Sequence, residues 1–169
     1  MTKMSATLRR LSLVLAFIAV TGLAGCGGKK AKDDESSIPN AVGADTNGDT
    51  GDSDSGKAGG LQTVHYPYDS FNLDGNAKDA LKANASILKS KSSYKIQIEG
   101  HCDRHGGIQY NIALGEKRAN AAKKFLEDLG VPSERVTTVS FGKERPLDPA
   151  ETEAADSKNR RANFVVTSK

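Results

Sequence analysis

The chain has 169 residues, of which 24 are Lys or Arg and 21 are Asp or Glu, so its formal net charge is +3. This length accommodates one ordinary domain with short appendages. The first 25 residues contain Lys3, Arg9 and Arg10 and no acidic residue, and the remaining chain therefore holds 21 basic against 21 acidic residues. A nucleic-acid partner normally demands a clear basic excess, so this balance argues against nucleic-acid binding.

The N-terminus predicts an export signal followed by a lipid anchor. The apolar run LSLVLAFIAV at residues 11–20 is too short to span a bilayer as a helix but is typical of a signal-peptide core. The following LAGC at residues 23–26 resembles the bacterial lipobox, which implies removal of residues 1–25 and acylation of Cys26. Several acyl chains give stable anchoring, and Gly27 in place of Asp points to the outer membrane. An ordinary signal peptide with an accidental cysteine is the open alternative.

Residues 26–60 are predicted to form a flexible tether. Gly, Ser, Asp, Ala and Lys dominate this segment, and Ile38 and Val42 are its only large apolar side chains, so it cannot form a core. The stretch DTNGDTGDSD at residues 45–54 resembles a calcium-binding loop, because Asp45, Asn47 and Asp49 stand at alternate positions. Thr50 stands where such a loop needs glycine and Gly56 where it needs glutamate, which favours a solvated acidic spacer.

Residues 61–169 are predicted to form one domain that contains three helices. Apolar residues recur at every fourth position from Leu73 to Leu88, and a second apolar stripe runs over residues 112–129 and ends at Gly130. A short third helix is expected to begin with Asp148 as N-cap and Pro149 in its first position.

Four strands are expected between and around these helices. They cover residues 62–68, where Pro67 ends the strand, and residues 94–98, 136–141 and 162–166. Tyr94, Ile96 and Ile98 alternate with polar residues, as in a half-buried strand. Strands that alternate with helices predict an α+β fold of two layers, with the helices packed on one face of a mixed four-stranded sheet.

The densest cluster of reactive side chains, residues 101–105, falls in the turn between the second strand and the second helix. Loops at strand ends collect binding groups on a rigid scaffold, and Gly106 and Gly107 permit a tight turn. With Cys26 assigned to lipid, Cys102 has no partner for an intramolecular disulfide.

Four segments carry a resemblance to a known family. They are GHCDRHGGIQYNIALGEKRANAAKKFL at residues 100–126, YPYDSFNL at 66–73, VSFGKERP at 139–146 and KNRRANFVV at 158–166. Together they resemble the OmpA-like peptidoglycan-binding domain, especially the version found in peptidoglycan-associated lipoproteins. The resemblance covers residues 61–169 and agrees with the lipobox and the tether.

The resemblance implies a non-enzymatic protein without a cofactor that binds the diaminopimelate group of the cell-wall stem peptide. It assigns Asp103 to the ammonium group of this ligand and Arg118 to its carboxylate. Carboxylate and guanidinium groups match the two charges of such a zwitterion independently of any family. Leu114 lies three positions after Asn111 and four before Arg118, so the three residues share one helix face.

The resemblance also implies supporting residues and partners. Tyr68 and Asp69 form the opposite wall of the pocket, and Asn159 lies near the pocket or supports it. His105 replaces an arginine of the family, which weakens the grip on the ligand or makes it pH-dependent. The expected partners are peptidoglycan, the outer membrane through Cys26, and a TolB-type β-propeller protein of the Tol system. A paralogue that only anchors is the open alternative to a Tol-system component.

Two other functions remain as hypotheses for the residue 101–105 cluster. His101, Cys102, Asp103 and His105 offer metal-ligand types, although one short loop closes a tetrahedral shell poorly. Cys102 beside a histidine is also the pattern of a thiol hydrolase, which would act on the wall.

Overall fold

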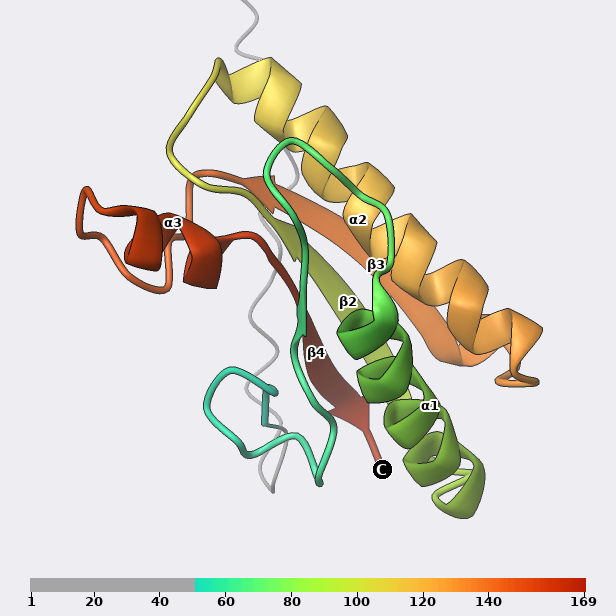
Figure 1. Ribbon diagram of the computed structural model, residues 1–169. Helices are drawn as coiled ribbons and strands as arrows, with labels where there is room; N and C mark the ends of the chain where they lie inside the picture. Colours follow the sequence, from blue (N-terminus) through green and yellow to red (C-terminus); the bar gives the residue numbers. More distant parts are fainter. Residues whose placement is uncertain (1–50) are drawn as a thin grey trace, which may run out of the picture. The chain divides into compact units, whose positions relative to one another are not determined.

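The computed structural model describes residues 51–169, which fold into a sheet covered by helices (Figure 1). The predicted signal segment, the lipobox cysteine Cys26 and the tether up to residue 50 lie outside the described residues.

The sheet has four strands in the order β1-β4-β2-β3. The strands are β1 (Val64–His65), β2 (Lys95–His101), β3 (Val136–Gly142) and β4 (Arg161–Ser168). β2 pairs parallel with β3 and antiparallel with β4, and β1 pairs antiparallel with β4. The prediction of a mixed four-stranded sheet is therefore confirmed.

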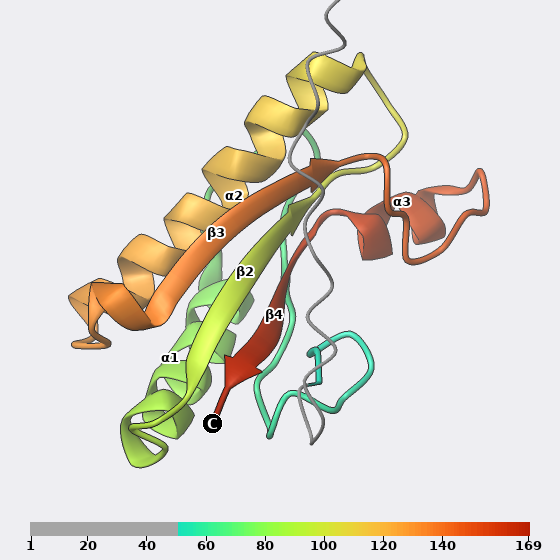
Figure 2. The same cartoon turned by 180° about the vertical axis from the view of Figure 1, so that it is seen from behind.

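Two helices, α1 (Gly75–Ser90) and α2 (Ile108–Asp128), cover one face of this sheet, as Figures 1 and 2 both show. The buried residues of α1 include Ala77, Leu81 and Leu88, which belong to the predicted stripe. The third helix, α3 (Glu153–Asn159), lies at the end of the sheet where β4 begins, and a 3-10 turn, Ser133–Arg135, precedes β3. The two-layer prediction is thus confirmed for the two long helices.

The core is built from the alternate strand residues that face the helices and from the apolar faces of the helices. Ile96 and Ile98 of β2 and Phe164 of β4 are each at most 1% exposed. A glycine pair brings α2 close to β2, because a Cβ atom on Gly100 would lie 1.9 Å from the carbonyl oxygen of Gly115. This close approach fixes the start of α2 above the end of β2.

The predicted start of α3 is wrong. The helix begins at Glu153, and Thr152 is its N-cap, whose hydroxyl accepts a hydrogen bond from the Ala155 amide at 3.2 Å. Asp148 instead accepts from the Ala150 amide at 3.1 Å and from Lys158 at 2.8 Å. An aspartate that bonds to the amide two residues ahead forms a local turn, which competes with helix capping.

The predicted end of the tether at residue 60 is also wrong. Residues 51–60 pack against the domain, and Ala58 within them is fully buried. The composition of this segment offers too few apolar side chains for a core, but its polar groups find partners on β4. Ser53 donates from its backbone to Phe164 O at 3.0 Å, for example. The folded part of the chain therefore includes at least these ten residues.

Candidate functional site

The predicted site residues meet in a small pocket beside loop 102–107, which we call the Asp103 pocket. Its volume is about 120 Å³, and it contains six of the eight predicted binding residues. It is lined by Tyr68, Asp69, Asp103, His105, Gly106, Tyr110, Asn111 and Leu114.

Asp103 is the acidic group of this pocket and is 6% exposed. Arg160 donates to its Oδ2 at 3.2 Å, and the His105 amide donates to its Oδ1 at 3.2 Å. A carboxylate has about four lone-pair sites. These two bonds therefore fix the orientation of Asp103 and still leave it capacity to accept a hydrogen bond from a ligand.

Asn111 shapes the loop that carries Asp103. Its Nδ2 donates to His105 O at 2.7 Å and to Gly107 O at 3.1 Å. Gly106 has φ +82°, in the left-handed region that glycine adopts without strain. Gly107 is the N-cap of α2 and offers no side-chain cap. The first amides of α2 therefore lack a side-chain acceptor, an arrangement that favours anions.

Arg118 lies behind the pocket, at 1% exposure, rather than among its lining residues. Its guanidinium donates to Ser70 O at 2.8 Å, His101 O at 2.9 Å and Pro67 O at 3.1 Å. Burial lowers the pKa of Arg118, although a guanidinium remains charged in proteins. Arg118 thus joins the loop after β1 to the end of β2 and places a positive charge near Asp103.

The loop after β1 forms the opposite wall of the pocket. Tyr68 is 63% exposed and meets the His105 ring edge-on, with ring centroids 6.1 Å apart. Asp69 has φ 48°, which aspartate tolerates better than most residues. It accepts a hydrogen bond from the Tyr110 hydroxyl, and this bond raises the pKa of Tyr110. The exposed ring of Tyr68 and the carboxylates of Asp69 and Asp103 therefore border the pocket opening.

The sequence did not predict the role of Asp156, a buried acid on α3 that holds loop 102–107 through two of its side chains. Its Oδ2 accepts from His105 Nε2 at 3.1 Å and from Arg104 Nε at 3.3 Å. Burial opposes ionisation of Asp156, but the His105 bond and the charge of Arg104 bring its pKa below the usual value. No local pattern signals this role, because the partners are more than 50 positions apart.

Asn159, predicted at or near the ligand, lies outside the Asp103 pocket. Its Oδ1 accepts from the amides of Leu147 and Asp148 at 2.7 and 3.0 Å, and its Nδ2 donates to Asp148 O at 2.7 Å. It therefore holds the segment that precedes α3 and supports the site only indirectly.

The side chains proposed for metal binding or thiol chemistry point to different partners. His101 stacks on Phe141, with ring centroids 5.5 Å apart, and Cys102 Sγ donates to Asn111 O at 3.3 Å. Burial raises the pKa of the Cys102 thiol, which disfavours the reactive thiolate. Within residues 51–169 no group of three or more His, Cys, Asp or Glu side chains is placed to hold a metal ion.

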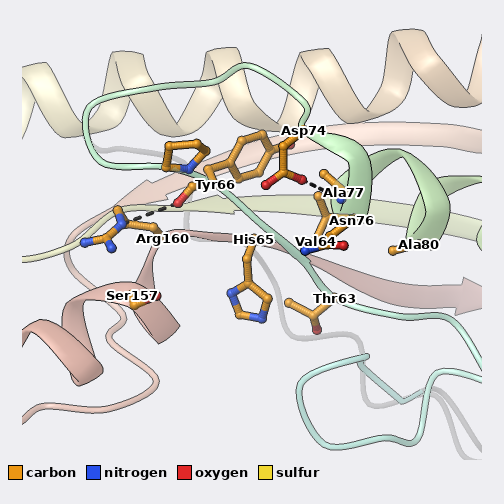
Figure 3. A pocket seen from close by; sticks show the side chains of 11 residues that line it. Thr63, Val64, His65, Tyr66, Asp74, Asn76, Ala77, Ala80, Ser157 and Arg160 are labelled. Carbon is orange, nitrogen blue, oxygen red and sulfur yellow. Dashed lines mark hydrogen bonds between the residues drawn. The ribbon is translucent and has the colours of Figure 1, made fainter.

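A larger cavity, of about 370 Å³, lies between β1 and the start of α1 (Figure 3). None of the predicted binding residues lines it. Arg160 borders this cavity and donates from Nε to Tyr66 O at 3.4 Å, while its Nη1 donates to Asp103. Arg160 thus separates the larger cavity from the Asp103 pocket.

Comparison with known proteins identifies the family of the chain. The model of the OmpA family matches residues 65–160. A peptidoglycan-associated lipoprotein of Mesorhizobium japonicum is 35% identical over 158 residues, which cover 93% of this chain and 92% of the relative. One from Pasteurella multocida is 43% identical over 100 residues, 59% of this chain and 67% of the relative.

Solved structures also resemble this chain. The crystal structure of the peptidoglycan-associated lipoprotein from Burkholderia pseudomallei matches with a TM-score of 0.60 and 38% identity, covering 62% of this chain and 88% of that one. The C-terminal domain of Helicobacter pylori MotB has a TM-score of 0.61 at 19% identity, with 65% and 87% coverage, and shares the fold alone. The chain belongs to the OmpA family and, within it, to the peptidoglycan-associated lipoproteins.

The names of these relatives refer to association with peptidoglycan and to no catalytic activity. Among residues 51–169, no helix combines the length and the apolar character needed to cross a bilayer.

Proposed function

We propose that this chain is a lipid-anchored protein of the outer membrane that binds peptidoglycan without a covalent bond and so tethers the membrane to the wall. The observation that carries this proposal is the Asp103 pocket. It combines an oriented carboxylate, nearby guanidinium groups and an uncapped helix start at one opening. The names of the relatives, all peptidoglycan-associated lipoproteins, support the same function.

The ligand that fits this pocket is the zwitterionic side group of diaminopimelate. Asp103 accepts hydrogen bonds from the ammonium group of the ligand. A pocket of about 120 Å³ has room for one such side group rather than for a whole stem peptide. Leu114 and Tyr68 supply apolar contact for the methylene groups of the ligand.

The ligand carboxylate is attracted to the positive side of the pocket. Arg118 and Arg160 both lie close to Asp103, and α2 begins after Gly107 without a side-chain cap, which favours an anion at that helix start. Because Arg118 already donates to three carbonyl oxygens, it acts mainly through its charge and by holding the pocket wall. His105 lies at the rim of the pocket, where it faces the ring of Tyr68.

Co-sedimentation with purified sacculi tests this proposal. Residues 27–169 are mixed with sacculi that contain diaminopimelate and, separately, with sacculi that contain lysine at the same position. We expect binding only to the first, and at least about tenfold weaker binding for Asp103→Asn. Asp79→Asn is the matched control, because Asp79 is an exposed acid on α1 that forms an ion pair with Lys82. Equal pelleting with both sacculi, or by Asp103→Asn and wild type, contradicts the ligand assignment.

The lipid anchor and the Tol partner belong to the same proposal. Acylation at Cys26 predicts that labelled fatty acid is incorporated into the wild type and not into Cys26→Ser. A TolB-type β-propeller protein is proposed to bind the same face, so it should compete with sacculi for the Asp103 pocket. Simultaneous binding of both partners contradicts a shared site.

A further inference from the structure

The last part of the predicted tether is attached to the domain as an additional strand-like segment. Residues 51–58, which we call the clamp segment, lie along the outer edge of β4. Asp52 forms an antiparallel bridge with Val165. The Ser53 amide donates to Phe164 O at 3.0 Å, and the Val166 amide donates to Gly51 O at 3.1 Å. The clamp segment therefore continues the edge position that β1 occupies beside the start of β4.

Side chains lock the clamp segment in this register. Ser53 Oγ donates to Asn163 Oδ1 at 2.8 Å and accepts from the Phe164 amide at 2.9 Å. Arg161 Nε donates to Asp54 Oδ2 at 2.7 Å, with the two side chains only 5% and 9% exposed. An ion pair this buried favours one geometry, because separation would leave charges without partners.

Gly51 gives independent evidence that the closed conformation is specific. The Lys57 amide donates to Asp52 O at 3.1 Å and closes the segment on itself. A Cβ atom on Gly51 would lie 2.2 Å from Lys57 O. Only glycine fits at this position while the segment stays closed.

The clamp segment lies at the end of the sheet opposite to loop 102–107, as Figures 1 and 2 both show. The chain after it continues into β1, which pairs with β4 at only two positions, and then into the loop that bears Tyr68 and Asp69. A force applied directly to β1 would therefore reach a wall of the Asp103 pocket.

We propose that the clamp segment bears the load of the tether and keeps this load away from the ligand pocket. This inference rests on the proposed function, in which the lipid pulls at one end and the wall holds the other. The clamp segment is antiparallel to β4, and β4 runs away from the pocket. A pull from residue 50 therefore acts along the paired strands and loads their hydrogen bonds together.

Opening of the clamp segment would also lengthen the tether. Residues 51–60 would add at most about 35 Å, which is their fully extended length at roughly 3.5 Å per residue. The pocket would then feel the load only after this length has been released.

Amide hydrogen exchange on residues 27–169 tests whether the clamp segment is closed in solution. We expect protected amides at Ser53 and Val166, and at least about tenfold faster exchange at Ser53 in Gly51→Ala. Gly75→Ala is the matched control, because a Cβ atom there meets nothing within 4 Å. Ser53 exchanging at the rate of an unstructured peptide in the wild type would overturn the proposal.

Force measurements test the role of the clamp segment. The chain is held at residue 27 and at an exposed position beside the pocket, in Gln109→Cys. We expect an extension step of at most about 35 Å before global unfolding, which disappears in Gly51→Ala. Without load, Gly51→Ala should bind sacculi as the wild type does. Loss of this unloaded binding, or a wild type without the step, overturns the clamp. A wild type that shows the step but never binds sacculi overturns only the proposed function.

Discussion

Replacement of Arg118 by lysine tests how the pocket wall is held. Arg118 donates to the carbonyl oxygens of Pro67 and Ser70 in the loop after β1 and of His101 at the end of β2. The ammonium group of a lysine is a compact charge and cannot reproduce a planar fork that points in three directions. We expect Arg118→Lys to keep one of these three hydrogen bonds and to leave two carbonyl oxygens without a donor.

The loss of folding free energy in Arg118→Lys follows from the two carbonyl oxygens left without a donor. Each buried acceptor without a partner costs about 1–3 kcal/mol, so two cost roughly 2–6 kcal/mol in all. The unfolding free energy of a domain is about 5–15 kcal/mol, so Arg118→Lys should remain folded at 25 °C. Its thermal midpoint should fall by about 10 °C, and the loop that bears Tyr68 should exchange its amide hydrogens faster.

Arg135→Lys is the matched control for this experiment. Arg135 also donates to three carbonyl oxygens, those of Leu88, Lys91 and Tyr94, at 2.8–2.9 Å, but at the end of α1 remote from the pocket. Both variants should lose similar stability by thermal and urea unfolding, whereas only Arg118→Lys should weaken binding to sacculi at 25 °C. An unchanged thermal midpoint in Arg118→Lys, or equal loss of binding in both variants, would refute the reasoning.

Three further predictions follow from packing and charge. Gly100→Ala should lose at least about 2–3 kcal/mol in urea unfolding, because its Cβ atom collides with the Gly115 carbonyl. Cys102 should react with iodoacetamide at pH 8 on the order of 100-fold more slowly than in urea, because burial raises its pKa. Asp156 has a lowered pKa, so its stabilising contribution is present above pH 4 and is lost as pH falls through the folded value. Urea midpoints should therefore fall less steeply between pH 5 and pH 3 in Asp156→Asn.

Each of these predictions has its own contradicting result. Gly75→Ala, which has open space around it, should be close to neutral, and equal losses in both glycine variants would exclude a specific collision. Rapid alkylation of folded Cys102 would revive the thiol hypothesis. Identical pH slopes for wild type and Asp156→Asn would show that the ion pairs of Asp156 do not contribute to stability.

Much of the fold was predictable because its signals are local. The apolar stripe of α1 and the alternation of β2 depend on neighbours a few positions apart, and the structure confirms both elements. The start of α3 was mispredicted because Asp148 and Thr152 are both acceptable caps by residue type. The amide of Asn159 holds the Asp148 segment outside the helix, and sequence spacing does not reveal that contact.

The sequence by itself determined the family signature, the two-layer sheet and helix pattern, and the loop in which Asp103 stands. Only the tertiary structure decided which polar groups meet. Arg118 and Ser70 are 48 positions apart, His105 and Asp156 are 51 apart, and Ser53 and Asn163 are 110 apart. A periodic pattern records which face of an element is buried, whereas the partner of a buried charge depends on how distant segments are brought together. For this reason the buried role of Arg118, the support by Asp156 and the docked end of the tether became visible only in the folded chain.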